Sequence, residues 1–136
     1  MLSKYQVILA VAVFIIDPKN KLLIVKKSPS EKIDGGLWTV PGGKVKPDEP
    51  VINAAKREVK EEVNLRIINC FWIGEDVFFS GGMWFHGEHF LTRLKKAGKI
   101  RLEKNLTDYA WITKSDIDKY DYHPNIKKAI RQILYG

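Results

Sequence analysis

The chain has 136 residues, of which 45% are hydrophobic and 29% are charged. This balance is typical of a folded protein and excludes a disordered one, so we expect a single domain over residues 1–136. The net charge of +7 is compatible with an anionic partner, but basic residues never run beyond two in succession, which favours a solvated lysine-rich surface. A lone cysteine, Cys70, excludes an internal disulfide and a cysteine-based zinc site.

The first apolar run covers residues 7–16 and is too short to span a bilayer. Its β-branched residues favour a buried strand, and no small-residue cleavage site follows it. Residues 17–20 read as a turn, after which residues 22–25 form a second short apolar run. We therefore expect a β-hairpin and, without an export or membrane signal, a cytoplasmic protein.

Further strands are expected where apolar and β-branched residues gather between turn signals. Residues 28–36 form a polar loop, and the Pro41-Gly42-Gly43 sequence should end the short strand that follows it. The expected strands after this loop cover residues 37–40, 69–79, 84–94 and 109–112.

Two segments show helical spacing, at residues 50–63 and 125–134. Pro50 suits the first turn of the first helix, and Asp48 or Glu49 could cap it. Strands interleaved with two helices predict an α/β fold in which a mixed β-sheet is sandwiched between α-helices.

The first helix carries Glu58, Glu61 and Glu62 within about 100° of arc. These glutamates border an expected apolar stripe, and two lysines face the other way. Carboxylates gathered on one side suit Mg²⁺ or Mn²⁺, which prefer oxygen ligands. Taken alone, three glutamates are more often an ordinary solvated face. The stripe consists of Ile52, Ala55, Val59 and Val63, and the lysines are Lys56 and Lys60.

The surrounding residues decide between these readings, because residues 43–65 resemble the Nudix box of the MutT-like Nudix hydrolase family. That box reads Gly-x5-Glu-x7-Arg-Glu-U-x-Glu-Glu-x-Gly-U, in which U is a bulky aliphatic residue. The preceding residues 38–43 also resemble the family's approach to the box. The residues that match at the required spacing are Gly43, Glu49, Arg57, Glu58, Val59, Glu61, Glu62 and Leu65.

The resemblance implies a Nudix fold and a role for each box residue. Glu58, Glu61 and Glu62 are implied as ligands of Mg²⁺, with Mn²⁺ as the alternative ion, and a carbonyl of Gly42 or Gly43 would add a further ligand. Glu58 and Glu61 are implied as catalytic groups, although the general base could be any of the three glutamates or a residue elsewhere. Arg57 is implied to orient these side chains.

Two further positions are expected to shape the Nudix loop. Glu49 should brace the loop against the helix instead of binding metal. Asn64 stands where the family usually has glycine, at a position that needs a left-handed backbone. Asparagine tolerates that conformation best among the other residues, so the loop should keep its shape.

An additional acid often follows the box in this family, and Glu88, Glu103 and Asp108 are candidates, although each is more often a plain surface carboxylate. His86 and His89 flank Glu88, but their spacing of three in a strand places them on opposite faces and argues against a shared metal cluster.

Four residues are candidates for contact with a substrate: Lys27 for phosphate, Trp84 and Phe85 for a base, and Glu88. Lys27 could equally be a strand-end charge, and strand aromatics more often belong to a core.

The resemblance implies Mg²⁺-dependent hydrolysis of a phosphoanhydride bond in a nucleoside diphosphate derivative. Small size favours a nucleoside triphosphate pyrophosphatase, with oxidised nucleotides among its candidate substrates, and the alternative is an ADP-ribose or nucleotide-sugar hydrolase. A different class would be a non-catalytic module that binds nucleotide or RNA. Nucleic acid is not an expected partner, because no basic stripe interleaved with aromatics is present. The resemblance also implies a possible homodimer.

Overall fold

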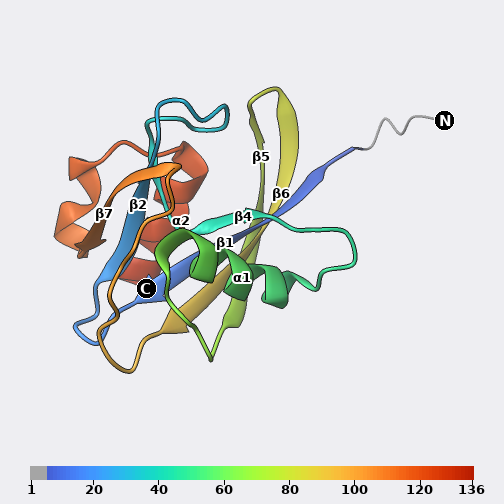
Figure 1. Cartoon of the computed structure of the whole chain (residues 1–136). Helices are drawn as coiled ribbons and strands as arrows, with labels where there is room; N and C mark the ends of the chain where they lie inside the picture. The colour runs from blue at the N-terminus through green and yellow to red at the C-terminus, as the bar shows by residue number, and fades with distance from the viewer. Residues whose placement is uncertain (1–5) are drawn as a thin grey trace.

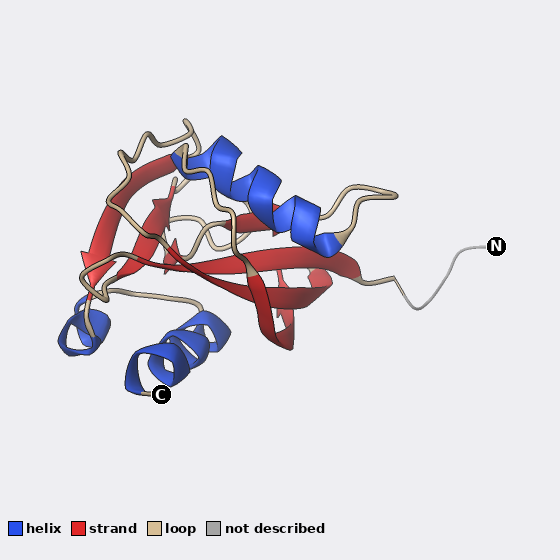
Figure 2. Ribbon diagram, turned by 90° about the horizontal axis from the view of Figure 1, so that it is seen from below, coloured by secondary structure: helices blue, strands red, loops and turns tan. Residues whose placement is uncertain are grey.

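The computed structural model describes residues 6–136, and residues 1–5 of the domain expected over 1–136 lie outside the described part. A mixed β-sheet carries helix α1 (Val51–Val63) on one face and helix α2 (Pro124–Tyr135) on the other (Figures 1 and 2). This arrangement confirms the expected fold class. None of the helices within residues 6–136 is long and apolar enough to cross a bilayer.

The sheet is built around β1, which pairs with strands from three parts of the chain. The strand order is β3-β2-β1-β6-β5, with β4 added to β1 and β7 added to β2. Among the pairings between the strands named below, β1–β6 is parallel and the others are antiparallel, so the sheet is mixed. The strands are β1 (Ile8–Ile16), β2 (Leu22–Lys27), β3 (Trp38–Thr39), β4 (Gly42–Lys44), β5 (Phe71–Ser80), β6 (Met83–Arg93) and β7 (Leu106–Ile112).

Two local expectations differ from the structure near β1. The β1–β2 hairpin pairs only at Ile16 and Leu22, because β2 takes β7 and β3 as its neighbours. The glycines after Pro41 do not simply end a strand, since Gly42–Lys44 forms β4 against β1. A Cβ on Gly42 would collide with the carbonyl oxygen of Val11, so this close pairing requires glycine.

Helix α1 begins and ends differently from a side-chain-capped helix. Pro50 is the N-cap, and no side chain bonds the first turn, so the caps predicted at Asp48 or Glu49 are wrong. At the other end Asn64 adopts φ 62° and ψ 31°, and its N–H donates to the carbonyl of Lys60 at 3.1 Å. The left-handed backbone expected at Asn64 is therefore confirmed.

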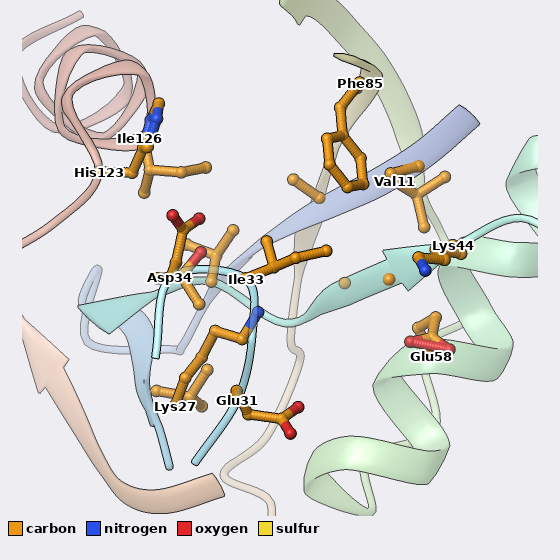
Figure 3. A pocket seen from close by; sticks show the side chains of 18 of the residues that line it. Val11, Lys27, Glu31, Ile33, Asp34, Lys44, Glu58, Phe85, His123 and Ile126 are labelled. Carbon is orange, nitrogen blue, oxygen red and sulfur yellow. The ribbon is translucent and has the colours of Figure 1, made fainter. Parts of the chain in front are cut away.

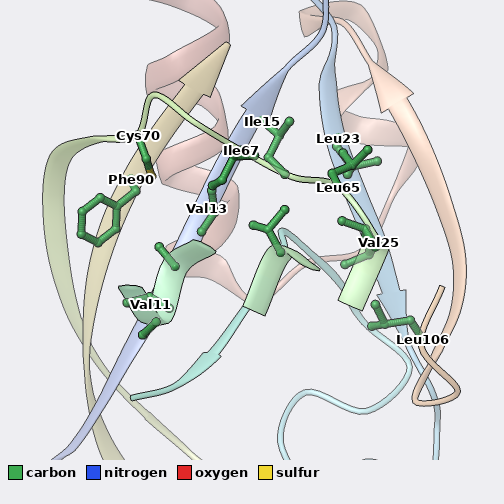
Figure 4. Packing of buried hydrophobic residues seen from close by; sticks show 14 residues of the cluster. Val11, Val13, Ile15, Leu23, Val25, Leu65, Ile67, Cys70, Phe90 and Leu106 are labelled. Carbon is green, nitrogen blue, oxygen red and sulfur yellow. The ribbon is translucent and has the colours of Figure 1, made fainter. Parts of the chain in front are cut away.

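The first core lies between α1 and the sheet (Figure 4). Its helical residues meet Val11, Val13 and Ile15 of β1. Ile52 is 37% exposed, and its place in the predicted stripe is wrong because it belongs to the i,i+4 row that contains Lys56 and Lys60. The buried face of α1 consists of Ala54, Ala55, Val59 and Val63.

The second core lies on the other face of the sheet, under α2 and a 3₁₀ helix, η1 (Lys114–Lys119), that the sequence pattern did not predict. Phe14, Ile24 and Ile130 are fully buried there. Trp38 packs against this core and meets the Tyr120 ring edge-on, with 4.8 Å between centroids. The two cores together fix β1 and β4 against α1.

Candidate active site

Strand β4 and helix α1 bring two glycines of the box against two of its glutamates. The N–H of Gly42 donates to Oε1 of Glu62 at 2.8 Å. A Cβ on Gly43 would collide with Oε2 of Glu58 and lie 2.6 Å from its Cδ. The glycines thus supply one hydrogen bond and the space that allows both carboxylates to lie against the strand.

The two carboxylates share an environment that disfavours their charged forms. The pKa of Glu62 is raised to about 8, mainly by burial and to a smaller degree by the neighbouring charges of Glu58 and Glu103, against the opposing effect of the Gly42 N–H. Burial also raises the pKa of Glu58, although Arg57 opposes the shift. Desolvated carboxylates with too little positive charge around them fit a bound divalent cation, since such ions prefer oxygen ligands.

Arg57 connects the loop to the helix. Its Nε and Nη2 donate to the two oxygens of Glu49 at 2.8 and 2.9 Å, which is the bracing contact expected for Glu49. Its Nη1 donates to Oε1 of Glu58 at 2.7 Å and to Oε1 of Glu61 at 3.1 Å. The guanidinium lowers the pKa of Glu49 to about 2, and Glu49 in turn raises the pKa of Arg57.

Glu61 differs from the other two glutamates of the helix. Its side chain is 47% exposed and meets Arg57, whereas Glu58 and Glu62 line the adjacent cavity. The three carboxylates therefore share one arc of α1 without sharing one environment.

A cavity of about 700 Å³ extends from these glutamates across the sheet to α2. Figure 3 shows Glu58 and Lys44 on one side of it and His123 and Ile126 on the other, with the ring of Phe85 between them. The far part contains an aromatic pair, since Phe78 stacks on Phe85 with 5.1 Å between ring centroids, and the side chains of Asp34 and His123 also line it. The cavity thus joins a carboxylate end to an aromatic end.

The predicted substrate contacts divide into two pairs. Lys27 and Phe85 line the cavity, whereas Trp84 and Glu88 do not. Successive side chains of a strand face opposite sides, so Phe85 turns into the cavity while Trp84, which is 52% exposed, turns away.

The two histidines of β6 follow the same alternation. His89 lines the cavity, and His86 lies on the other face beside Glu75 and Glu88. The expectation that the histidines occupy opposite faces is confirmed.

Of the three downstream acids, the structure brings Glu103 to the site. Its N–H donates to the carbonyl of Glu62 at 2.9 Å, and its charge raises the pKa values of Glu58 and Glu62. Asp108 is exposed and accepts a hydrogen bond from the N–H of Tyr109, and Glu88 does not line the cavity.

Sequence reasoning missed a polar pair within the cavity wall. His89 Nε2 and Asp76 Oδ1 lie 3.0 Å apart, and Asp76 Oδ2 is buried without a hydrogen-bond partner. Asp76 pairs in register with Gly87, where a Cβ would lie 2.5 Å from Asp76 Oδ1. A glycine in the middle of a predicted strand was the one available signal of this close approach.

Comparison of the sequence with known proteins identifies one family. The NUDIX domain family model matches residues 7–133. An 8-oxo-dGTP diphosphatase of Buchnera aphidicola subsp. Schizaphis graminum (strain Sg) is 30% identical over 115 residues, which cover 82% of each chain. Nucleoside triphosphatase NudI of Escherichia coli (strain K12) is 21% identical, and the match covers 86% of this chain and 90% of NudI.

The fold is similar to that of solved Nudix structures. The MutT protein from Methanosarcina mazei Go1 superposes with a TM-score of 0.84 at 22% sequence identity. The match covers 98% of this chain and 94% of that chain. With the box glutamates, glycines and arginine assembled as described, this chain belongs to the Nudix family and is a Nudix hydrolase of the MutT-like kind.

Proposed function

We propose that the protein is a Mg²⁺-dependent nucleoside triphosphate pyrophosphatase, and that oxidised nucleotides are among its substrates. The observation that carries this proposal is the convergence of Glu58 and Glu62 at the carboxylate end of a nucleotide-sized cavity. The names of the curated relatives, an 8-oxo-dGTP diphosphatase and a nucleoside triphosphatase, support a triphosphate substrate.

The carboxylate end fits a divalent cation because its available donors are hard oxygens. Glu58 and Glu62 would hold Mg²⁺, with the Gly43 carbonyl as a further ligand, and Mn²⁺ suits the same donors. When bound, the ion neutralises charge on the phosphate oxygens and activates a water for attack on phosphorus.

The protein's own residues position the phosphates and manage the proton. Lys27 lines the cavity and binds phosphate oxygens as a point charge. Arg57 holds Glu58 in place through the 2.7 Å bond and fixes the loop through Glu49. Glu61, whose side chain is solvent-accessible, and Glu103, whose backbone N–H donates to Glu62, are the two carboxylates that we propose as acceptors of the proton of the attacking water.

The aromatic end of the cavity binds the nucleobase. Phe78, Phe85 and Ile126 offer flat and apolar surface, and His123 closes the wall from the start of α2. Base-aromatic contact is tolerant of base identity, so this surface supplies affinity more than selectivity.

A substrate panel tests the proposal. The purified protein is incubated with the common (d)NTPs, 8-oxo-dGTP, ADP-ribose and a nucleotide sugar, with and without Mg²⁺, and products are separated by chromatography. We expect metal-dependent release of pyrophosphate and a nucleoside monophosphate, lost in Glu62→Gln and kept in Asp118→Asn, an exposed acid near α2. Turnover of ADP-ribose or the nucleotide sugar alone would show that the substrate is not a nucleoside triphosphate. Turnover unaffected by Glu62→Gln would refute the assignment of Glu62 to the catalytic site.

A further inference from the structure

We propose that the β5–β6 hairpin carries a second metal site, for a borderline divalent cation such as Zn²⁺, formed by Glu75, His86 and Glu88. One ligand atom from each residue lies within 4.8 Å of the other two. The set mixes an imidazole nitrogen with two carboxylate oxygens, which is the donor chemistry of Zn²⁺ and of its neighbours Co²⁺ and Ni²⁺. None of the three ligands belongs to α1.

Two carboxylates lie within hydrogen-bond distance of one nitrogen of His86. Nε2 of His86 lies 2.5 Å from Oε1 of Glu75 and 3.0 Å from Oε1 of Glu88. An imidazole nitrogen carries at most one hydrogen, so it cannot make a full hydrogen bond to both carboxylates. A cation bound among the three side chains would satisfy both carboxylates, because a metal accepts several ligands at once.

The strand register adds a repulsion that a cation removes. Glu75 and Glu88 are directly opposite partners in the antiparallel β5–β6 ladder. Like charges at such positions destabilise a hairpin. A divalent cation bound between the two carboxylates would offset this repulsion.

A β-bulge orients one of the ligands. The pairing of β5 shifts between Trp72 and Gly74, which places Trp72 on the same face as Glu88. The indole N–H of Trp72 then donates to Oε2 of Glu88 at 2.9 Å, so that Oε1 is left facing His86. Such support of a metal-binding carboxylate by an outer hydrogen bond is a general feature of metal sites.

The site would share its strands with the catalytic cavity. Side chains alternate along β5 and β6, so the residues adjacent to the three ligands in the sequence, Asp76, Gly87 and His89, line the cavity on the other face. Metal binding would therefore fix the strands that form the cavity wall, without adding a ligand to the reaction.

Zinc titration of a suitable parent protein tests the site. The parent is Glu58→Gln/Glu62→Gln, stripped of metal, so that the carboxylates of α1 do not compete. Isothermal titration calorimetry with Zn²⁺ alone, without nucleotide, should show one site per chain. His86→Asn in the parent should weaken binding by at least about tenfold, the scale seen when metal sites lose support. The matched control Asp118→Asn, an acid paired with Lys127, should leave it unchanged.

A spectroscopic measurement on the parent alone tests the site even if the His86→Asn variant unfolds. In the parent, nuclear magnetic resonance of the histidine side chains should show the Nε2 signal of His86, and not of His89 or His123, shifting on addition of Zn²⁺. Equal Zn²⁺ affinity in the parent and His86→Asn, or an unshifted His86 signal, would overturn the proposal. Because this parent lacks Glu58 and Glu62, the two carboxylates of the proposed Mg²⁺ site, either outcome is separate from the fate of the proposed pyrophosphatase.

Discussion

Replacing Gly43 with alanine is expected to displace a catalytic carboxylate by a known amount. The added Cβ would lie 2.6 Å from Cδ of Glu58, whereas carbon atoms in contact lie about 3.5–4.0 Å apart. The carboxylate must therefore move by about 1 Å, and a misplacement of that size costs roughly 100-fold in rate. We expect kcat/KM to fall by about that factor.

The same substitution should have little effect on folding. Alanine suits a strand at least as well as glycine, and the group that must move is a side chain, so the free energy of unfolding should change by less than about 1 kcal/mol. Gly74→Ala is the matched control, because a Cβ there meets no atom within 4 Å. The assays are steady-state hydrolysis and urea unfolding. Wild-type kcat/KM in Gly43→Ala would refute the reasoning.

Three further predictions follow from other contacts. Arg57→Lys loses the paired bonds to Glu49 together with those to Glu58, and kcat/KM should drop by more than about tenfold, measured with saturating Mg²⁺. Ile24→Ala empties a fully buried position and should cost about 2–5 kcal/mol in denaturant unfolding. Glu62 has a pKa raised to about 8, so the metal-free protein should lose stability as pH rises from about 4.5 through 8. Thermal melts in EDTA should show this slope in the wild type and a flatter one in Glu62→Gln, and an equal slope in both would contradict the assigned pKa.

Much of the fold was predictable because local chemistry and tertiary structure agree. The spacing of Val59 and Val63 gave the buried side of α1, and Asn64 carried its own preference for a left-handed turn. The box spacing also predicted which residues approach one another, since Glu49 and Arg57 are eight positions apart and meet only when the loop folds back on the helix.

The rest depends on partners that lie far away in the sequence. Gly42 and Gly43 read as a strand end, and only β1 turns them into a strand. Ile52 was predicted to be buried because its side chain is apolar, but the side chain alone does not specify whether its row of α1 faces the sheet. Asp76 and Glu75 gain their roles from register with β6, which a single sequence does not specify.

The central claim is that Glu58 and Glu62 hold a divalent cation against the phosphates of a nucleotide. The direct measurement is electron paramagnetic resonance of Mn²⁺ bound with a non-hydrolysable nucleoside triphosphate, which detects phosphorus coupled to the metal. The account predicts phosphorus coupling in the wild-type protein and its loss in Glu58→Gln/Glu62→Gln, with nucleotide still bound. The same coupling in both proteins would contradict it.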